Sequence, residues 1–330
     1  MSQIGIYACS AVQADEVNLY SARHYQTDEA LYARFTELTG IAVNRIEDKE
    51  DPLLERIVSE GANSPADVFI TVDVGRLWRA DQKGILAAVD SAVLNERIPA
   101  NLRHPEGHWF GFATRARVIL YAKDRVDPSL IDDYADLADA RWKGEVCIRS
   151  STNVYNLALL GSIIAHDGPE AAEAWAAGVV ANFAREPQGG DTDQIKAVAA
   201  GECGLAVANT YYYVRLLASD DPAERAIADK VGLIWPNQAT TGTHVNISGA
   251  GMVKTAPHPE AAVKFLEYLA SDEAQRYFAN GNNEYPVVPG LLDNPALASL
   301  GAFKADAIDI AAIGEHQPAA QKIFDRVGWP

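Results

Sequence analysis

The sequence predicts an α/β protein of two lobes, each built on a parallel-type sheet with helices on both faces. Its 330 residues are more than one hydrophobic core usually serves. From residue 15 onward, strand-like and helix-like segments alternate, which is typical of parallel sheets. Two extended stretches near 111–120 and 244–253 interrupt this alternation, and we expect each to run from one lobe into the other. Such paired connections predict a cleft between the lobes.

The first lobe begins with strands that alternate with capped helices. In TDEALYARFTELTG, Thr27 or Asp28 is the expected cap, and Gly40 ends the helix. In DPLLERIVSEG, Asp51 is the expected cap and Pro52 the first helical residue. The expected strands are EVNLYSA, IAVNRIE, ADVFITV and WFGFATRARVILYAK, and SLIDDYADLADARWKG is expected to be one helix.

The same alternation restarts near residue 144, which predicts the second lobe. The expected strands are GEVCIRS, CGLAVANT, VGLIWP and HVNISGAGMV. The expected helices are NVYNLALLGSIIAHDG, GPEAAEAWAAGVVANF, DTDQIKAVAAG, YYYVRLLAS and the pair in HPEAAVKFLEYLASDEAQRYFANG. We see no internal repeat and no low-complexity segment.

Charge narrows the class of partner. The chain carries 45 acidic and 28 basic side chains, for a net charge of −17. Nucleic acids and anionic membrane surfaces select for basic patches, so neither is an expected partner. The first 14 residues, MSQIGIYACSAVQA, are apolar, lack Lys and Arg and end in small residues. We interpret 1–14 as a leader or the remnant of a signal peptide, and Cys9 only weakly resembles a lipoprotein cleavage site.

Polar aromatic residues follow several strands at the edge where ligands bind in α/β sheets. His24 and Tyr25 follow EVNLYSAR, Tyr155 follows EVCIRSSTN, and Tyr211 and Tyr212 follow GLAVANT. These segments are distant in sequence but equivalent in topology. A cleft is therefore expected to gather four phenols and one imidazole.

This donor set favours a hard trivalent cation. A phenol has an ordinary pKa near 10, which makes it a poor ligand for most divalent ions. The charge of bound Fe(III) can deprotonate its ligands outright. A run of three tyrosines is also common in packing, so the pattern alone leaves both interpretations open. His104 and His108 have the spacing of helical metal ligands, but Pro105 and Gly107 predict a turn there.

Four long stretches carry a family resemblance that covers residues 15–330. They are VNLYSARHYQTDEALYARFTELTGI, ERIVSEGANSPADVFITVD, GEVCIRSSTNVYN and GECGLAVANTYYYVRL. The chain resembles the periplasmic ferric-iron-binding proteins of ABC transporters, in the branch that uses several tyrosines. The resemblance implies the type II periplasmic binding protein fold, with 15–112 plus about 250–285 as the first lobe. The second lobe is then 113–249 plus about 286–330.

The resemblance also implies a ligand set and a role. His24 and Tyr25 are the expected ligands of the first lobe, and Tyr155, Tyr211 and Tyr212 those of the second. Tyr213 is left outside as a packing residue. The implied function is capture of Fe(III) in the periplasm by a monomer that delivers it to an ABC permease.

Other functions stay open at this point. A binding protein for an organic ligand or oxyanion, or an intracellular iron chaperone, shares the same fold. An enzyme is not expected, because no nucleophile elbow, phosphate loop or dinucleotide fingerprint is present.

Within the family, some members use a carboxylate and a bound anion in place of tyrosines. Asp73 stands at the carboxylate position, but we do not expect it to bind iron, because tyrosines already supply oxygen ligands. The SSTN segment at 150–153 remains a possible anion site at a helix N-terminus. Ferric iron with four phenolates has a net charge of −1. Arg115 is the first choice to offset that charge, with Arg23 and Arg215 as alternatives.

The sheet order expected in this fold implies a disulfide between Cys147 and Cys203. Each cysteine stands eight residues before an expected ligand, Tyr155 and Tyr211 respectively. If both tyrosines meet at one ion, the cysteines lie at similar depth in neighbouring strands about 4.8 Å apart. That spacing suits a disulfide, and an exported protein meets an oxidising environment. Two separate buried thiols are the alternative.

Overall fold

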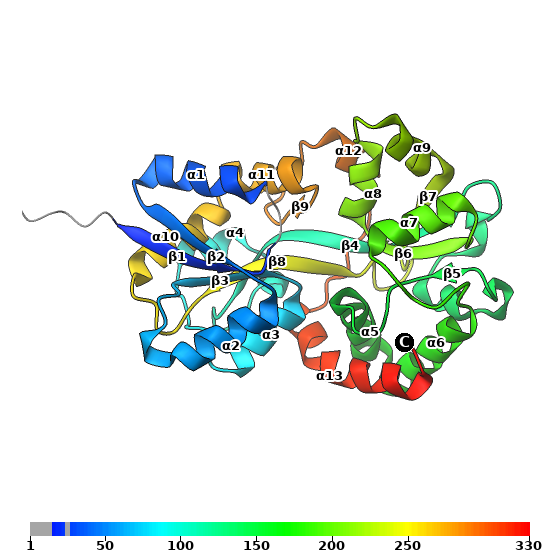
Figure 1. The fold of residues 1–330 in the computed structure, drawn as a ribbon, viewed down its shortest axis with the longest axis horizontal. Coiled ribbons are helices and arrows are strands. Elements are labelled where there is room, and N and C mark those ends of the chain that lie inside the picture. Colours follow the sequence, from blue (N-terminus) through cyan, green and yellow to red (C-terminus); the bar gives the residue numbers. More distant parts are fainter. Residues whose placement is uncertain (1–14, 24–26) are drawn as a thin grey trace, which may run out of the picture.

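The computed structural model describes residues 15–23 and 27–330. The expected leader at 1–14, with Cys9, and the expected ligands His24 and Tyr25 lie outside these described residues. Figure 1 shows two halves side by side along the long axis, each with helices above and below a layer of strands. Two strands, β4 and β8, run through the middle and join the halves.

The strands form one twisted sheet with the order β2-β1-β3-β8-β4-β6-β5, while β7 and β9 pair with β4. Their bounds are β1 Glu16–Ser21, β2 Ala42–Glu47, β3 Val68–Val72, β4 Phe110–Ala122, β5 Val146–Cys147, β6 Leu205–Asn209, β7 Val231–Ile234, β8 Val245–Met252 and β9 Tyr285–Pro286.

The helices alternate with these strands. Their bounds are α1 Asp28–Thr39, α2 Glu50–Glu60, α3 Val74–Gln82, α4 Ala92–Arg97, α5 Val154–Asp167, α6 Pro169–Ala181, α7 Asp191–Ala200, α8 Thr210–Leu217, α9 Pro222–Lys230, α10 Pro259–Leu269, α11 Asp272–Asn282, α12 Pro295–Ala298 and α13 Ile310–Val327. Among the described residues, no helix is long and apolar enough to cross a bilayer.

Strand β4 links the two halves of the sheet. Its first part, Phe110–Ala116, pairs antiparallel with β8, and its second part, from Arg117, pairs antiparallel with β6. Strand β8 also pairs with β3. The flanking pairs, β1 with β2 and β3 and β5 with β6, are parallel. Each half is therefore parallel at its outer side, and the antiparallel strands that cross the middle are the ones expected from the extended stretches in the sequence.

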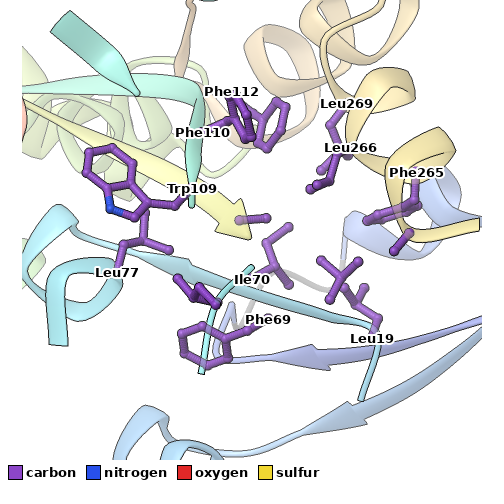
Figure 2. Close-up of a cluster of buried hydrophobic side chains, with 14 of the residues drawn as sticks. Leu19, Phe69, Ile70, Leu77, Trp109, Phe110, Phe112, Phe265, Leu266 and Leu269 are labelled. Atoms are coloured by element: carbon purple, nitrogen blue, oxygen red, sulfur yellow. The ribbon is translucent and has the colours of Figure 1, made fainter. Parts of the chain in front are cut away.

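Two separate clusters of buried side chains make up most of the core. The first is shown in part in Figure 2, where Leu19 of β1, Phe69 and Ile70 of β3, Leu77 of α3, Trp109, Phe110 and Phe112 near the start of β4, and Phe265, Leu266 and Leu269 of α10 face one another. The second surrounds β6 and helices α5 to α8. Helix α13 contributes to both, with Ile313 in the first cluster and Phe324 in the second. The change of cluster along β4 falls between Ala113 and Ala116.

Two local expectations were wrong. The segment 129–144 is not one helix but short 3₁₀ turns at 128–130, 134–138 and 140–142. The carboxylates of Asp127, Asp133 and Asp139 each accept a hydrogen bond from the N–H two residues later. Each of these bonds caps a new short 3₁₀ segment, so the segments do not join into one helix. Helix α2 begins at Glu50, one residue before the expected cap Asp51. Pro52 is therefore the third helical residue, which is tolerated because the first N–H groups of a helix have no partner within the helix.

Cys147 of β5 and Cys203, just before β6, form a disulfide with a Cα–Cα distance of 6.0 Å. Strand β5 pairs with β6 on one side, and Val146 forms a parallel bridge with Phe183 on the other. The bond therefore fastens two neighbouring strands whose following segments lead to helices α5 and α8.

Candidate metal centre

The three tyrosines of the second half that the sequence singled out lie together. Tyr155 is the second residue of α5, and Tyr211 and Tyr212 are the second and third residues of α8. The hydroxyl of Tyr211 donates to the Tyr155 hydroxyl at 3.2 Å, and the rings of Tyr211 and Tyr212 have centroids 4.2 Å apart. All three stand in the first turn of a helix, where the helix dipole favours negative charge on a phenol oxygen.

Tyr213 has a different environment from its two neighbours. Its hydroxyl donates to the carbonyl of Val231 at 2.7 Å, and its ring is buried in the second cluster. Successive residues on a helix are rotated by about 100°. The sequence of three tyrosines therefore divides into two that face Tyr155 and one that packs against β7.

The pKa of Tyr212 is raised to about 12. Burial of the ring is the main cause, and Tyr155 and Asp191 add to it, while a hydrogen bond with Tyr211 and the charge of Arg149 act in the opposite direction. The phenol is therefore protonated at neutral pH when nothing is bound. A ligand that takes it as phenolate must supply strong positive charge.

Guanidinium groups surround these phenols. The central carbons of Arg115, Arg117 and Arg149 lie 5.8, 5.7 and 5.6 Å from the centroid of the Tyr155 ring. Arg215 lies 5.7 Å from the Tyr211 ring. Of these four arginines, Arg115 and Arg215 were expected from the sequence, and Arg117 and Arg149 were not. Arg115 and Arg117 are two residues apart in a buried strand and so share a face, which was an available signal.

Arg115 is almost completely buried in β4, and its Nη1 donates to the hydroxyl of Ser248 at 3.3 Å. Its Nε and Nη2 have no hydrogen-bond partner among the described residues. Burial tends to lower the pKa of this group, but Glu284, Tyr155, Tyr211 and Asp73 outweigh it and raise the pKa. Arg115 is therefore a fixed cation with donor capacity left over, located where groups from both halves meet.

Arg117 holds the helix starts in place. It forms an ion pair with Asp191, the first residue of α7, at 2.7 Å. It also donates to the side-chain oxygens of Asn156 in α5 at 2.7 Å and of Asn209, the N-cap of α8, at 3.3 Å. One guanidinium thus connects the N-termini of the three helices around the phenols. It acts as a positioning residue for Tyr155 and Tyr211.

A buried polar chain leads from Arg115 into the first half. Ser248 of β8 donates to Glu284 at 2.6 Å, and Glu284 pairs with Arg23 at 3.3 Å. Arg23 also pairs with Asp28 at the start of α1, at 2.8 Å. Arg23, the last described residue before 24–26, is therefore linked to Arg115 through the side chains of Glu284 and Ser248.

Asp73 serves as a structural cap. Its carboxylate accepts hydrogen bonds from the N–H of Gly75 and from the amides of Asn246 and Gln317, at 2.9, 2.8 and 2.9 Å. Its backbone has φ 81°, an unfavourable value for a residue with a Cβ. Both carboxylate oxygens are already used as acceptors within the fold. That Asp73 does not bind the ion stays a prediction.

At 150–153, Ser150 and Thr152 contact each other through their hydroxyls at 3.1 Å, and the N–H of Ser151 donates to the carbonyl of Pro330 at 2.7 Å. The N-cap of α5, Asn153, makes no side-chain capping bond. The first turn of α5, which carries Tyr155, is thus not capped by its own side chain.

The chain is similar to known solute-binding proteins, several of which are named for iron. The profile of the family described as bacterial extracellular solute-binding protein matches residues 63–301. Iron uptake protein A1 of Synechocystis sp. is 55% identical over 96% of this chain and 88% of its own length. A solved structure of Trichodesmium IdiA (FutA) contains iron and citrate. It is 57% identical to this chain, the match covers 96% of this chain and 100% of that chain, and the TM-score is 0.92.

More distant structures share the same architecture. The ferric binding protein of Campylobacter jejuni is 43% identical, covers 95% of this chain and 100% of its own, and has a TM-score of 0.90. The two-lobed fold of type II expected from the sequence is confirmed by these likenesses.

Proposed function

The chain belongs to the family of bacterial extracellular solute-binding proteins, and from that premise we propose that it binds Fe(III) between its two lobes for uptake by an ABC transporter. The observation that carries the proposal is the convergence of Tyr155, Tyr211 and Tyr212 at helix N-termini. Hard anionic oxygen suits a hard trivalent ion. The names of the relatives, an iron uptake protein and ferric binding proteins, support the same cargo.

Charge supports a ferric rather than a divalent cargo. Deprotonating several phenols near neutral pH needs a trivalent ion, and the resulting anionic cluster needs cations nearby. Arg115 supplies one such charge, with two nitrogen donors that have no partner among the described residues. Arg149 and Arg215 stand over the same rings. In the ferric complex, these groups would offset the net negative charge of iron with its phenolates.

The first lobe is proposed to contribute His24 and Tyr25. Both lie outside the described residues, but the adjacent Arg23 is held by Glu284 and Asp28. Glu284 reaches Arg115 through Ser248. The chain therefore enters this segment close to the phenols of the second lobe, and a hinge at β4 and β8 allows the two lobes to close on one ion.

The same proposal covers the cellular context. We assign the monomer to the periplasm, with an ABC permease as its partner, and we place the lobe boundaries near residues 113 and 250. An oxygen-rich anion at the start of α5 is compatible with the absent side-chain cap at Asn153. The Trichodesmium relative was solved with both iron and citrate.

The decisive experiment is a visible spectrum of the purified protein before and after addition of ferric citrate. Ferric phenolate absorbs in the visible, so we expect a new band that saturates at one iron per chain. A colourless protein that instead binds an organic ligand or an oxyanion would contradict the proposal. Fractionation of the native host separates a periplasmic protein from an intracellular iron chaperone.

A further inference from the structure

A second group of metal-ligating side chains lies away from the tyrosines. Asp81 of α3 and His104 and His108, in the turn before β4, offer ligand atoms that all lie within 4.8 Å of one another. The Nδ1 of His108 is 2.5 Å from Oδ1 of Asp81, and the Nε2 of His104 is 3.6 Å from Oδ2 of the same carboxylate. One carboxylate therefore bridges two imidazoles.

The turn is built to bring the two imidazoles together. The N–H of His104 donates to the carbonyl of Trp109 at 2.9 Å, and the N–H of Gly107 donates to the carbonyl of His104 at 3.0 Å. Gly107 has φ 76°, and a Cβ there would meet the carbonyl oxygen of Val89 at 2.5 Å. As a result, the rings of His104 and His108 stack with centroids 4.4 Å apart and planes 6° apart. The sequence correctly indicated a turn here, but its Pro and Gly were taken to argue against a metal site.

Electrostatics at this position favour a cation. Asp81 stands in the last turn of α3, at the helix end where positive charge is stabilised. Glu106 lies 3.8 Å from the Nε2 of His108 and adds a second carboxylate.

The geometry needs only a small adjustment. Donor atoms bound to one tetrahedral ion at about 2.0–2.1 Å are about 3.3 Å apart. The present separations reach that value by side-chain rotation, because His104 and His108 are 16% and 25% exposed. The N–H of Glu106 donates to Nδ1 of His104 at 3.1 Å. Coordination through Nε2 places a proton on Nδ1, so this exposed hydrogen bond must open to water.

We propose that Asp81, His104 and His108 form a second metal site, for a divalent transition ion of the zinc type. Two imidazoles and one carboxylate are donors that suit such an ion and suit Fe(III) less well than phenolates do. Three protein ligands leave the remaining positions to water. Asp81 stands on α3 and both histidines lie just before Trp109 of the first core cluster, whereas the phenols stand on α5 and α8. The site is therefore distinct from the phenol cluster in both chemistry and place.

The test is titration of the ferric-loaded protein with Zn(II) by isothermal calorimetry, so that the tyrosines are already occupied. We expect one zinc ion per chain, with binding weakened at least about tenfold in His108→Ala and in Asp81→Asn. Absence of zinc binding at micromolar concentrations, or equal binding by these variants and the wild type, would overturn the proposal. If the protein takes up no iron, the ferric proposal fails, and the zinc titration is then made on Tyr212→Phe, which lacks one phenol of the other site. Failure of the ferric proposal is thus distinguished from failure of the zinc proposal.

A matched control is His258→Gln. His258 also contacts two carboxylates, Asp67 at 2.9 Å and Glu16 at 3.7 Å, but has no second imidazole beside it in the described part of the chain. This variant should bind zinc as the wild type does, and an equal loss of zinc would refute the assignment to His104 and His108. Thermal unfolding of each zinc-free variant identifies a folding defect. In that case His104→Gln provides the deciding measurement of zinc affinity.

Discussion

Replacing Tyr212 by phenylalanine should change how the affinity for Fe(III) depends on pH. With a pKa of about 12, the phenol is five units above pH 7, so forming the phenolate in the empty protein costs about 7 kcal/mol at that pH. Each unit of acidification adds about 1.4 kcal/mol. Iron binding releases this proton, so affinity rises with pH. The variant releases one proton fewer, because phenylalanine has none to lose.

The assay is competition with a chelator for Fe(III) between pH 5 and 7. The ratio of wild-type to variant affinity cancels the protonation of the chelator and the hydrolysis of iron, which are the same for both proteins. This ratio should rise about tenfold per pH unit, or about 100-fold across the range. A ratio that does not change with pH would refute the reasoning, since it would mean that Tyr212 does not bind as phenolate.

Tyr213→Phe is the matched control, because it removes a neighbouring phenol that faces the core. The affinity ratio for this variant should stay near one at every pH. Its free energy of unfolding should fall by about 1–3 kcal/mol, because the carbonyl of Val231 loses its buried donor. Equal effects of the two substitutions on iron binding would show that the assignment of the tyrosines is wrong.

Four further outcomes are expected. The denatured, unreduced protein should show one reactive thiol, that of Cys9, and loss of the Cys147–Cys203 bond, which spans 56 residues, should lower the free energy of unfolding by about 4 kcal/mol. Arg117→Met should lower it by about 3–5 kcal/mol in urea unfolding, because Asp191 stays buried without its main partner. Small-angle scattering should show a smaller radius of gyration for the iron-loaded form, and an unchanged radius would contradict lobe closure.

Much of the second-lobe site was accessible from the sequence, because it depends on local order along the chain. A buried strand followed by a helix places the first residues of that helix at the sheet edge where ligands bind. Tyr155 and Tyr211 follow this rule, and their hydroxyls are 3.2 Å apart in the structure. Cys147 and Cys203 each stand eight residues before one of these tyrosines. Because β5 and β6 are parallel neighbours, equal spacing along the chain also brings the two cysteines side by side.

The parts that sequence did not predict depend on contacts between distant segments. Arg117 and Asp191 are 74 positions apart, and nothing local shows that one guanidinium serves three helix starts. Helix α13 contains Pro318 and packs against both halves, so its pattern does not match a single apolar face. The short turns at 128–142 were missed because aspartates that suit helix caps were taken as parts of one helix.

The three buried arginines, Arg23, Arg115 and Arg117, differ in how fully their charge is compensated, and this difference points to their roles. Arg23 is paired with Asp28 and Glu284, and Arg117 with Asp191. Arg115 reaches a carboxylate only through the hydroxyl of Ser248 and keeps two nitrogens without a partner among the described residues. A buried donor without an acceptor is unfavourable, and the deficit is removed when an anion arrives. We infer that the paired arginines fix the geometry, while Arg115 favours the state in which the nearby phenols carry negative charge.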